Sequence, residues 1–201
     1  SFNFLLVIPK KFKLPSELLH HGKPFALFIG TIEPRKNLEV IFKAFSKDKS
    51  ILNKLDLIIC GRDGWLITFD ELITKYNLHE EFEKGRIIRR EFISESEKWI
   101  MIQQSKILLY PSFIEGFGLP VAEGLVAGTN VITSNTSSLL EVSSKSKRCI
   151  HINPENELEM IEAINNFLNS KDLKTEKNDF SWFKYGNSIE EKINKLVKNE
   201  K

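Results

Sequence analysis

Two short apolar runs, each closed by a glycine, constrain the fold of this chain more than any other feature. They read Phe25-Ala-Leu-Phe-Ile-Gly30 and Leu55-Asp-Leu-Ile-Ile-Cys-Gly61. A nearly continuous apolar run of this kind is typical of a strand that is buried on both faces of a parallel sheet. Between the two runs, Leu38 to Lys47 repeats apolar residues at helical spacing, which predicts an amphipathic helix.

Strand-like and helix-like segments alternate along the rest of the chain. Strands are expected at 85–89, 107–110, 130–133 and 149–152, and helices at 68–76, 95–104, 120–127, 137–142 and 155–168. Ser94 and Glu97 have the spacing of a capping box at the start of one of these helices. The alternation predicts an α/β, Rossmann-like fold, in which a mostly parallel sheet carries helices on both faces. Ligands of such sheets bind at the carboxyl ends of the strands.

The 201 residues, of which 41% are hydrophobic, suffice for one compact core. Prolines and lysines interrupt the first part, so we expect residues 1–24 to form a leading segment and linker. We place a Rossmann-like domain at 25–170. A polar linker and a C-terminal helix over Ser188 to Val197 are expected within 171–201. Because the chain begins with Ser1 rather than Met, we expect it to be a piece of a longer protein.

Composition argues against several classes of function. The 29 basic and 27 acidic residues leave a net charge of +2, which gives no extended basic field for nucleic acid. No apolar run approaches the ~20 residues that a membrane-spanning helix needs. Cys60 and Cys149 each lie in an apolar run, so we expect buried, reduced thiols and a cytoplasmic location. The four histidines show no metal-ligand spacing, and no Ser-His-Asp pattern occurs.

The stretch from Tyr110 to Gly128 contains most of the features that indicate a ligand-binding site. It is a glycine loop between a predicted strand and a predicted helix, and Gly116 and Gly118 allow the backbone to approach a ligand closely. The helix start offers unpaired N–H groups and the positive end of a dipole, which bind anions. Glu115 and Glu123 frame the loop, and carboxylates repel phosphate, so we expect both to accept hydrogen bonds from hydroxyls. Such a combination suits a sugar nucleotide.

Each of these residues also has an ordinary structural explanation. Arg35 and Lys36 precede a predicted helix, where they either hold a diphosphate or form a solvated basic loop. Glu123 is either a hydroxyl acceptor or a common dipole partner near a helix start. Arg62 is either a further cation of the nucleotide-binding site or a solvated turn residue. Turn and packing roles are expected for Asp63 and Trp65.

The run Glu115-Gly-Phe-Gly-Leu-Pro-x-x-Glu123 resembles the two-glutamate motif of retaining glycosyltransferases with the GT-B fold. Their large family, of the family 4 type, includes sucrose synthases and many bacterial mannosyltransferases. Other segments resemble the family in the same order, namely 30–37, 61–65, 127–134, 137–141, 152–155 and 180–182. The likeness extends over roughly residues 25–197. It implies that the chain is one half of a GT-B fold, the C-terminal domain that binds the sugar donor.

The resemblance implies a role for each matching residue. Lys36, with Arg35, would neutralise the donor diphosphate, and these two residues with Glu115 form the implied catalytic set. Glu115 would accept from hydroxyls of the transferred sugar and Glu123 from ribose hydroxyls. The implied donor-binding set is Gly30, Thr31, Arg35, Lys36, Arg62, Arg90, Glu115, Gly116, Phe117, Gly118, Leu119 and Glu123. No cofactor and no metal are expected, because basic side chains and a helix terminus would stabilise the leaving diphosphate.

The sequence departs from the family pattern at two places near the expected donor. Thr31 stands where many members have arginine, a loss for which Arg35 would compensate. Glu91 stands where glycine is usual, in a loop expected near the base, so the identity of the base is left open. The segments 34–37 and 62–65 resemble those of bacterial surface-polysaccharide mannosyltransferases, which makes mannose from GDP-mannose the first choice.

The main hypothesis is the donor-binding domain of a retaining glycosyltransferase that moves a hexose from a GDP- or UDP-hexose to a glycan or lipid-linked acceptor. The acceptor-binding domain would precede Ser1, so we expect the isolated chain to bind the donor without transferring sugar. The full-length enzyme would associate peripherally with the inner face of the membrane. One alternative is a non-catalytic nucleotide-sugar-binding or partner-docking module. Another is an unrelated phosphosugar enzyme, such as a GT-B epimerase, which would carry acid–base residues of its own.

Overall fold

The structure, a computed structural model, describes residues 23–170 of the chain. The predicted leading segment up to residue 22, the polar linker and the C-terminal helix lie outside the described residues.

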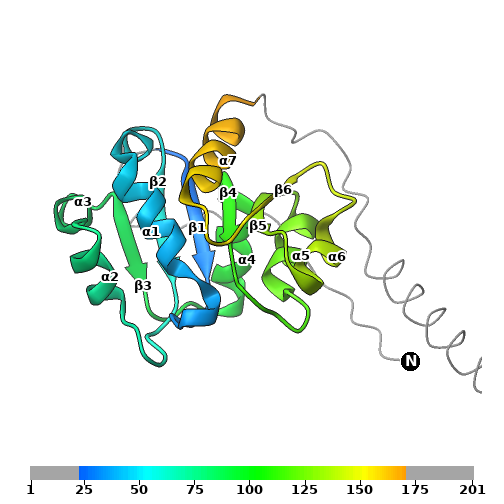
Figure 1. Ribbon diagram of the computed structural model, residues 1–201, viewed down its shortest axis with the longest axis horizontal. Coiled ribbons are helices and arrows are strands. Elements are labelled where there is room, and N and C mark those ends of the chain that lie inside the picture. The colour runs from blue at the N-terminus through cyan, green and yellow to red at the C-terminus, as the bar shows by residue number, and fades with distance from the viewer. Residues whose placement is uncertain (1–22, 171–201) are drawn as a thin grey trace, which may run out of the picture.

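Within the described residues, six strands form one fully parallel sheet. They are β1 (Phe25–Ile29), β2 (Asp56–Cys60), β3 (Ile87–Arg90), β4 (Ile107–Tyr110), β5 (Asn130–Ser134) and β6 (Cys149–Ile152). Their order across the sheet is β3-β2-β1-β4-β5-β6 (Figure 1). The order reverses between β1 and β4, and such a reversal opens a crevice at the carboxyl ends of the two strands. The predicted Rossmann-like α/β fold is therefore confirmed.

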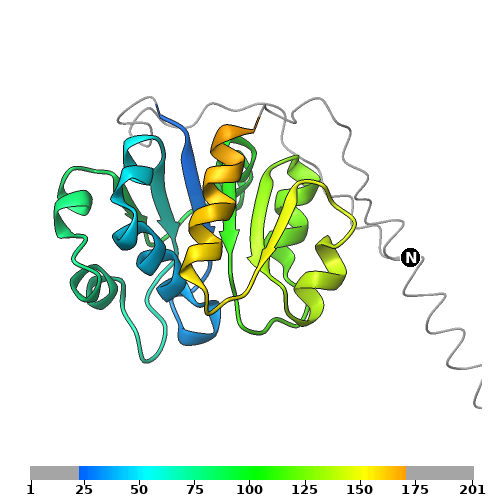
Figure 2. The ribbon, with the colours of Figure 1, turned by 45° about the horizontal axis from the view of Figure 1, so that its top comes forward.

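Helices cover both faces of the sheet, as expected. One face carries α1 (Leu38–Lys47), α2 (Phe69–Lys75), α3 (His79–Glu83) and α7 (Glu157–Asn169). The other face carries α4 (Glu95–Gln104), α5 (Leu119–Ala127) and α6 (Ser137–Ser143). The helices α1 and α7 lie side by side along the sheet, although most of the sequence separates them (Figure 2). This contact brings the loops before both helices to the same edge of the sheet.

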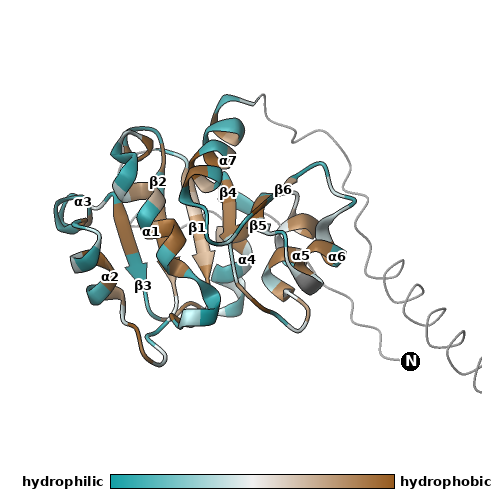
Figure 3. Cartoon of the chain, in the orientation of Figure 1, coloured by the Kyte–Doolittle hydropathy of each residue, from teal (hydrophilic) through white to brown (hydrophobic). Residues whose placement is uncertain are grey.

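Successive strand residues point to opposite faces of the sheet and supply two separate cores. On one face, Phe28 belongs to a buried cluster with Ile41 of α1 and Ile164 of α7. On the other face, Leu27 belongs to a cluster with Ile100 of α4 and Val121 of α5. Figure 3 shows this pattern as hydrophobic strands beneath helices with mixed faces. Truncating one of these buried side chains to alanine is expected to cost about 2–5 kcal/mol of the free energy of unfolding.

Some local details differ from the sequence-based expectation. The short helix α3 and the 3₁₀ segments η2 (Pro34–Lys36) and η3 (Lys49–Asn53) were not predicted. None of the α3 residues is buried, so the helix lacks the apolar stripe that periodicity detects. The helix α5 begins at Leu119, one residue before the predicted start, because Gly118 adopts a left-handed conformation just before it.

Both cysteines are free, as predicted. Cys60 is buried at the end of the interior strand β2, whereas Cys149 is only partly buried because β6 is an edge strand. None of the helices in the described part of the chain is both long and apolar enough to cross a membrane.

Candidate active site

The candidate site lies at the carboxyl edge of the sheet, where the loops that follow β1, β2 and β4 meet. The ends of β1 and β2 approach each other very closely here. The amide of Gly30 donates to the carbonyl of Cys60 at 2.9 Å, and a Cβ added to Gly61 would lie 1.9 Å from the carbonyl oxygen of Gly30. Only glycine fits at residue 61, which explains why the second apolar run ends as it does.

The centre of the site is a buried contact between Lys36, Tyr110 and Glu115. The Lys36 ammonium donates to the Tyr110 hydroxyl at 2.6 Å and to Oε1 of Glu115 at 2.5 Å. The Tyr110 hydroxyl donates to the same Glu115 oxygen at 3.0 Å. Lys36 is only 8% exposed, so its charge is held away from water and needs this partner. A residue of the loop after β1 is thereby joined to the loop after β4.

Arg35 completes this group from the solvent side. Its Nη1 lies 3.1 Å from the second oxygen of Glu115, and its Nε lies 2.6 Å from Oε1 of Glu33. Glu33 also accepts a hydrogen bond from the Trp65 indole nitrogen at 3.0 Å. Trp65 is therefore not the packing residue that the sequence suggested, because its ring stays 54% exposed and its polar end contacts Glu33.

The electrostatic arrangement of these residues differs from the sequence-based expectation. Arg35 and Lys36 were expected to leave a positive charge for an anion. In the structure Glu115 contacts both cations and Glu33 contacts Arg35, so two carboxylates balance two cations. Burial alone raises the pKa of Glu115, but the hydrogen bond and the charge of Lys36, with further contributions from Ser112 and Tyr110, together more than offset it, and the pKa is lowered overall. Burial and the charge of Glu115 raise the pKa of Tyr110, so its phenol stays protonated.

Asn37 fixes the loop that carries these cations, and the sequence-based reasoning missed it. Its side-chain amide donates to the carbonyls of Pro111 at 3.1 Å and Pro154 at 2.7 Å. Its backbone is left-handed, with φ 53° and ψ 44°, a conformation that asparagine tolerates better than most residues. The amide of Phe113 also donates to the carbonyl of Arg35 at 2.8 Å. An asparagine directly before a predicted helix was the signal that could have identified this position.

The loop after β4 leads directly into the start of α5. Gly118 has φ 84°, and a Cβ there would lie 2.4 Å from Cδ2 of Leu139, which is buried in α6. The hydroxyl of Ser138 donates to the carbonyl of Glu115 at 2.8 Å and holds the other end of the loop. At the start of α5, Pro120 has no N–H and the amide of Val121 donates to the carbonyl of Gly118 at 3.0 Å. This leaves the amide of Leu119 and the positive end of the helix dipole for an anion. The predicted residues Gly116, Phe117 and Leu119 belong to this same turn.

Glu123 lies farther into the helix than the first turn. No acidic residue occupies the first turn of α5, so Glu123 is not a dipole partner at the helix start. Its Oε1 instead accepts from the Lys98 ammonium of α4 at 2.7 Å, and only 12% of its side chain is exposed. Lys98 was not among the predicted site residues, because nothing in the sequence relates the two helices.

The remaining predicted residues lie on the same edge of the sheet but outside the central contact. Arg62 is exposed and its side chain forms no hydrogen bond or ion pair within the described residues, so it is a solvated turn residue in this structure. Arg90, at the end of β3, lies 3.6 Å from Glu97. Thr31 is partly buried and its methyl group packs against Gly64. Asp63 has the turn role that was predicted, since it accepts from the amide of Phe69 at 2.9 Å.

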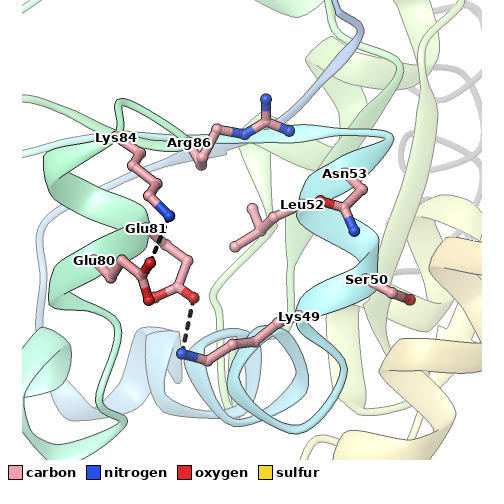
Figure 4. A pocket seen from close by; sticks show the side chains of 8 residues that line it. All are labelled: Lys49, Ser50, Leu52, Asn53, Glu80, Glu81, Lys84 and Arg86. Carbon is pink, nitrogen blue, oxygen red and sulfur yellow. Dashed lines mark hydrogen bonds and ion pairs between the residues drawn. The ribbon is translucent and has the colours of Figure 1, made fainter.

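A shallow hollow at the opposite edge of the sheet is a different feature (Figure 4). Residues of η3 and α3, which precede β2 and β3, form its walls. Its charged groups neutralise one another, as in the pair of Lys49 with Glu81 at 2.8 Å. A parallel sheet of this kind binds its ligand at the carboxyl edge, so this hollow is not the candidate site. No group of three or more histidine, cysteine or acidic residues in the described part of the chain could hold a metal ion.

The part of the sequence that contains the candidate site also matches a known family. The sequence profile of the family described as Glycosyl transferases group 1 matches residues 9–181. The chain belongs to the group 1 glycosyl transferases.

Two curated relatives of this group 1 glycosyl transferase are much longer than the chain. O-antigen chain mannosyltransferase B of Escherichia coli is 32% identical over 119 residues, which are 59% of this chain and 30% of that protein. Sucrose synthase of Melioribacter roseus is 28% identical over 146 residues, which are 66% of this chain and 18% of that protein. The chain therefore spans well under half the length of these relatives.

Solved structures share the fold of this group 1 glycosyl transferase. Sucrose-phosphate synthase of Thermosynechococcus elongatus superimposes with a TM-score of 0.69 at 18% identity, covering 94% of this chain and 50% of that one. A structure described as trehalose-6-phosphate from E. coli bound with UDP-2-fluoro glucose gives a TM-score of 0.63 at 13% identity, covering 81% of this chain and 41% of that one.

Proposed function

We propose that this chain is the donor-binding domain of a retaining glycosyltransferase that moves a hexose from a nucleoside-diphosphate sugar. The observation that carries the proposal is the contact of Lys36 with Tyr110 and Glu115, next to the start of α5 and at the reversal in strand order. A buried lysine beside a helix N-terminus suits a diphosphate. The carboxylate beside it suits sugar hydroxyls, which donate hydrogen bonds.

Binding of a donor would exchange one counter-charge for another. In the structure, Glu115 forms ion pairs with both Arg35 and Lys36. A diphosphate carries more negative charge than one carboxylate. It would therefore replace Glu115 in part of its ion pairs with the two cations, and the unpaired amide at the start of α5 would add a hydrogen bond. Glu115 would then turn an oxygen toward the hexose. A site that is neutral before binding holds no large unpaired charge while it is empty.

The same groups would assist the chemical step. During transfer the bond between the anomeric carbon and the diphosphate oxygen breaks, a bond to the acceptor hydroxyl oxygen forms on the same face of the sugar, and the proton of that hydroxyl passes to the departing diphosphate oxygen. Negative charge collects on the departing diphosphate, where Lys36, Arg35 and the helix start would stabilise it. This is why we propose that transfer needs no metal ion and no cofactor.

The comparisons support finer parts of the proposal. Several relatives are named mannosyltransferases of the O-antigen chain, which favours mannose as the transferred hexose and a polysaccharide or lipid-linked acceptor. One solved structure of the same fold carries UDP-2-fluoro glucose, which supports a nucleotide sugar as the ligand of such a site. We propose that an acceptor-binding domain completes the enzyme, that the isolated chain binds donor without transferring it, and that the enzyme works in the cytoplasm at the membrane face.

Calorimetric titration of the 201-residue chain with GDP, UDP and ADP tests this function. We expect saturable binding of one nucleotide, and a loss of affinity of about tenfold or more in Lys36→Met, because a charge-assisted hydrogen bond is removed. Lys47→Met is the matched control, since Lys47 forms an exposed pair with Glu157 at 3.1 Å, away from the contact of Lys36 with Glu115. Absence of binding to all three nucleotides, or equal affinity in Lys36→Met, would contradict the proposal.

A further inference from the structure

Lys98 is a partly buried charge next to the proposed donor site that the mechanism above does not use. Its ammonium lies 2.7 Å from Oε1 of Glu123 and 2.7 Å from Oε1 of Glu95. The two partners differ in their surroundings, because the side chain of Glu123 is 12% exposed and that of Glu95 is 73% exposed. The ion pair of Lys98 with Glu123 therefore joins α4 to α5 and is partly shielded from water.

Both helices of this pair start at the edge of the sheet where the donor would bind. The helix α4 follows β3, and α5 follows β4, so their first turns lie at the carboxyl ends of those strands. Lys98 lies in the first turns of α4, and its ammonium also lies 5.6 Å from the centre of the Trp99 ring. Its position is thus fixed by two carboxylates and an aromatic ring rather than by one flexible contact.

The two carboxylate oxygens of Glu123 differ in their hydrogen bonding. Oε1 accepts from Lys98, whereas Oε2 has no hydrogen-bond or ion-pair partner among the described residues. A carboxylate held at one oxygen cannot rotate freely, so the other oxygen points in one direction and is available for a hydroxyl. Burial alone lowers the pKa of Lys98, but its bonds to Glu123 and Glu95 more than offset this and raise it, so the lysine stays charged.

We propose that Lys98 is a positioning residue for the donor: it holds the carboxylate of Glu123 in a fixed orientation, so that the free oxygen receives the hydroxyls of the ribose. The proposal rests on the proposed function and adds a specificity to it. A site that depends on a fixed carboxylate should prefer a ribonucleotide to one without ribose hydroxyls, because an unpaired, partly buried acceptor is unfavourable. If the ion pair only stabilised the helices, its removal would lower the affinity for the ribonucleotide and for the form without ribose hydroxyls by the same factor.

The test therefore compares two ligands in several variants. The 201-residue chain is titrated with GDP and UDP and with their 2′,3′-dideoxy forms. In the wild type we expect the dideoxy form of the preferred nucleotide to bind at least about tenfold more weakly, since two hydroxyls that donate to a carboxylate are lost. In Lys98→Met we expect this ratio to fall to about threefold or less, because Glu123 loses the charge that orients it.

Matched variants separate this role from general effects on folding. Lys98→Arg keeps the charge and should keep most of the ratio, whereas Lys98→Gln loses the charge and should behave as Lys98→Met does. Because both neutral variants are tested, the result does not depend on the folding of a single one. Thermal melts show whether each variant is folded. Lys47→Met, which removes an exposed lysine pair elsewhere, should leave the ratio unchanged.

The outcomes distinguish this inference from the proposed function. If no nucleotide binds the wild type, the proposed function itself is wrong. If the wild type binds GDP or UDP but the ratio of ribose to dideoxy affinity is the same in the neutral Lys98 variants, only the inference is overturned. A ratio near one in the wild type would overturn it as well, because Glu123 would then make no use of the hydroxyls.

Discussion

Lys36 and Glu115 are 79 positions apart in the sequence, yet Nζ of the lysine lies 2.5 Å from Oε1 of the glutamate. The topology causes this contact, because β1 and β4 are neighbours in the sheet although two other strands lie between them in the chain. The loop after each strand therefore opens onto the same crevice. A carboxylate this close to a cation is favoured in its charged form, so the contact should make stability depend on pH.

The first prediction concerns acid stability. The pKa of Glu115 is lowered in the folded chain below its ordinary value of 4.5, so between these two values the unfolded chain binds more protons than the folded one. The stabilisation from this group is thus complete above pH 4.5 and is lost as the pH falls through the lowered value. Urea unfolding between about pH 3 and pH 7 should show this loss in the wild type.

Other acidic groups contribute to the same pH range, so the informative quantity is a difference. The pKa values of Glu39 and Glu97 are lowered as well, by hydrogen bonds to Lys75 and to Ser94 respectively. Glu115→Gln keeps the shape of the side chain but cannot titrate. The stability difference between wild type and Glu115→Gln should shrink as the pH falls below 4.5. A difference that stayed constant with pH would mean that Glu115 does not stabilise the fold through its charge.

The second prediction separates the backbone of Asn37 from its side chain. Glycine adopts the left-handed conformation freely, so Asn37→Gly loses only the two hydrogen bonds to Pro111 and Pro154. Alanine loses these bonds and adds about 1 kcal/mol of backbone strain at φ 53°. We therefore expect Asn37→Ala to unfold at a lower urea concentration than Asn37→Gly, and both at a lower concentration than the wild type.

The same two variants also test how the site depends on this loop. Because Asn37 follows Lys36 directly, loss of its hydrogen bonds should weaken nucleotide binding even in Asn37→Gly, whose backbone is unstrained. Equal nucleotide affinity in Asn37→Gly and the wild type would show that the loop keeps its position without these bonds. Equal stability of the glycine and alanine variants would contradict the argument from backbone strain.

Sequence reasoning predicted the fold well because the signals were local. The central strands β1, β2 and β4 are short, mostly apolar runs, and Ser94 with Glu97 forms the capping box that its spacing indicated. The short helix α3 escaped because it buries no residue and therefore shows no apolar stripe. Local patterns thus identified the main elements that build the cores, but they missed the surface helix α3 and also the short segment η3, although Ile51 and Leu52 of η3 are buried.

The site was predicted in part, for a different reason. Glu115 and Glu123 stand out because they frame a glycine loop, and this spacing is visible in one segment of sequence. Their partners Lys36 and Lys98 come from other elements, and which cation meets which carboxylate depends on the strand order and on the packing of α4 against α5. Periodicity carries no information about either. The counter-charges of the site could therefore be identified only from the folded chain.

The third prediction concerns the two thiols. Burial raises the pKa of Cys60 to about 12 and that of Cys149 to about 11, so neither is ionised near neutral pH. Because the thiolate is the reactive form, both should react slowly with a disulfide reagent at about pH 8 and fully after unfolding. Cys149 on the edge strand should react before Cys60. Rapid reaction of either thiol in the native chain would contradict the burial seen here.

The last prediction compares two glycines of the same loop. A Cβ at Gly118 would lie 2.4 Å from Cδ2 of Leu139, and the backbone there has φ 84°, whereas a Cβ at Gly116 would meet no atom within 4 Å. Gly118→Ala should therefore lower the free energy of unfolding by about 1–3 kcal/mol, through backbone strain and overpacking against α6. Gly116→Ala should change it by less than about 0.5 kcal/mol.

Nucleotide titration of the same pair extends the comparison to the site. Gly118 ends the loop at the start of α5, so a shift of this turn should also displace the amide of Leu119 that is proposed to help hold the diphosphate. Gly118→Ala should lose affinity together with stability. Gly116→Ala should keep its stability and lose affinity only if the ligand approaches the backbone at Gly116 closely. Equal stability of the two variants would show that Leu139 moves aside without cost, and the close contact with α6 would then not be what fixes this turn.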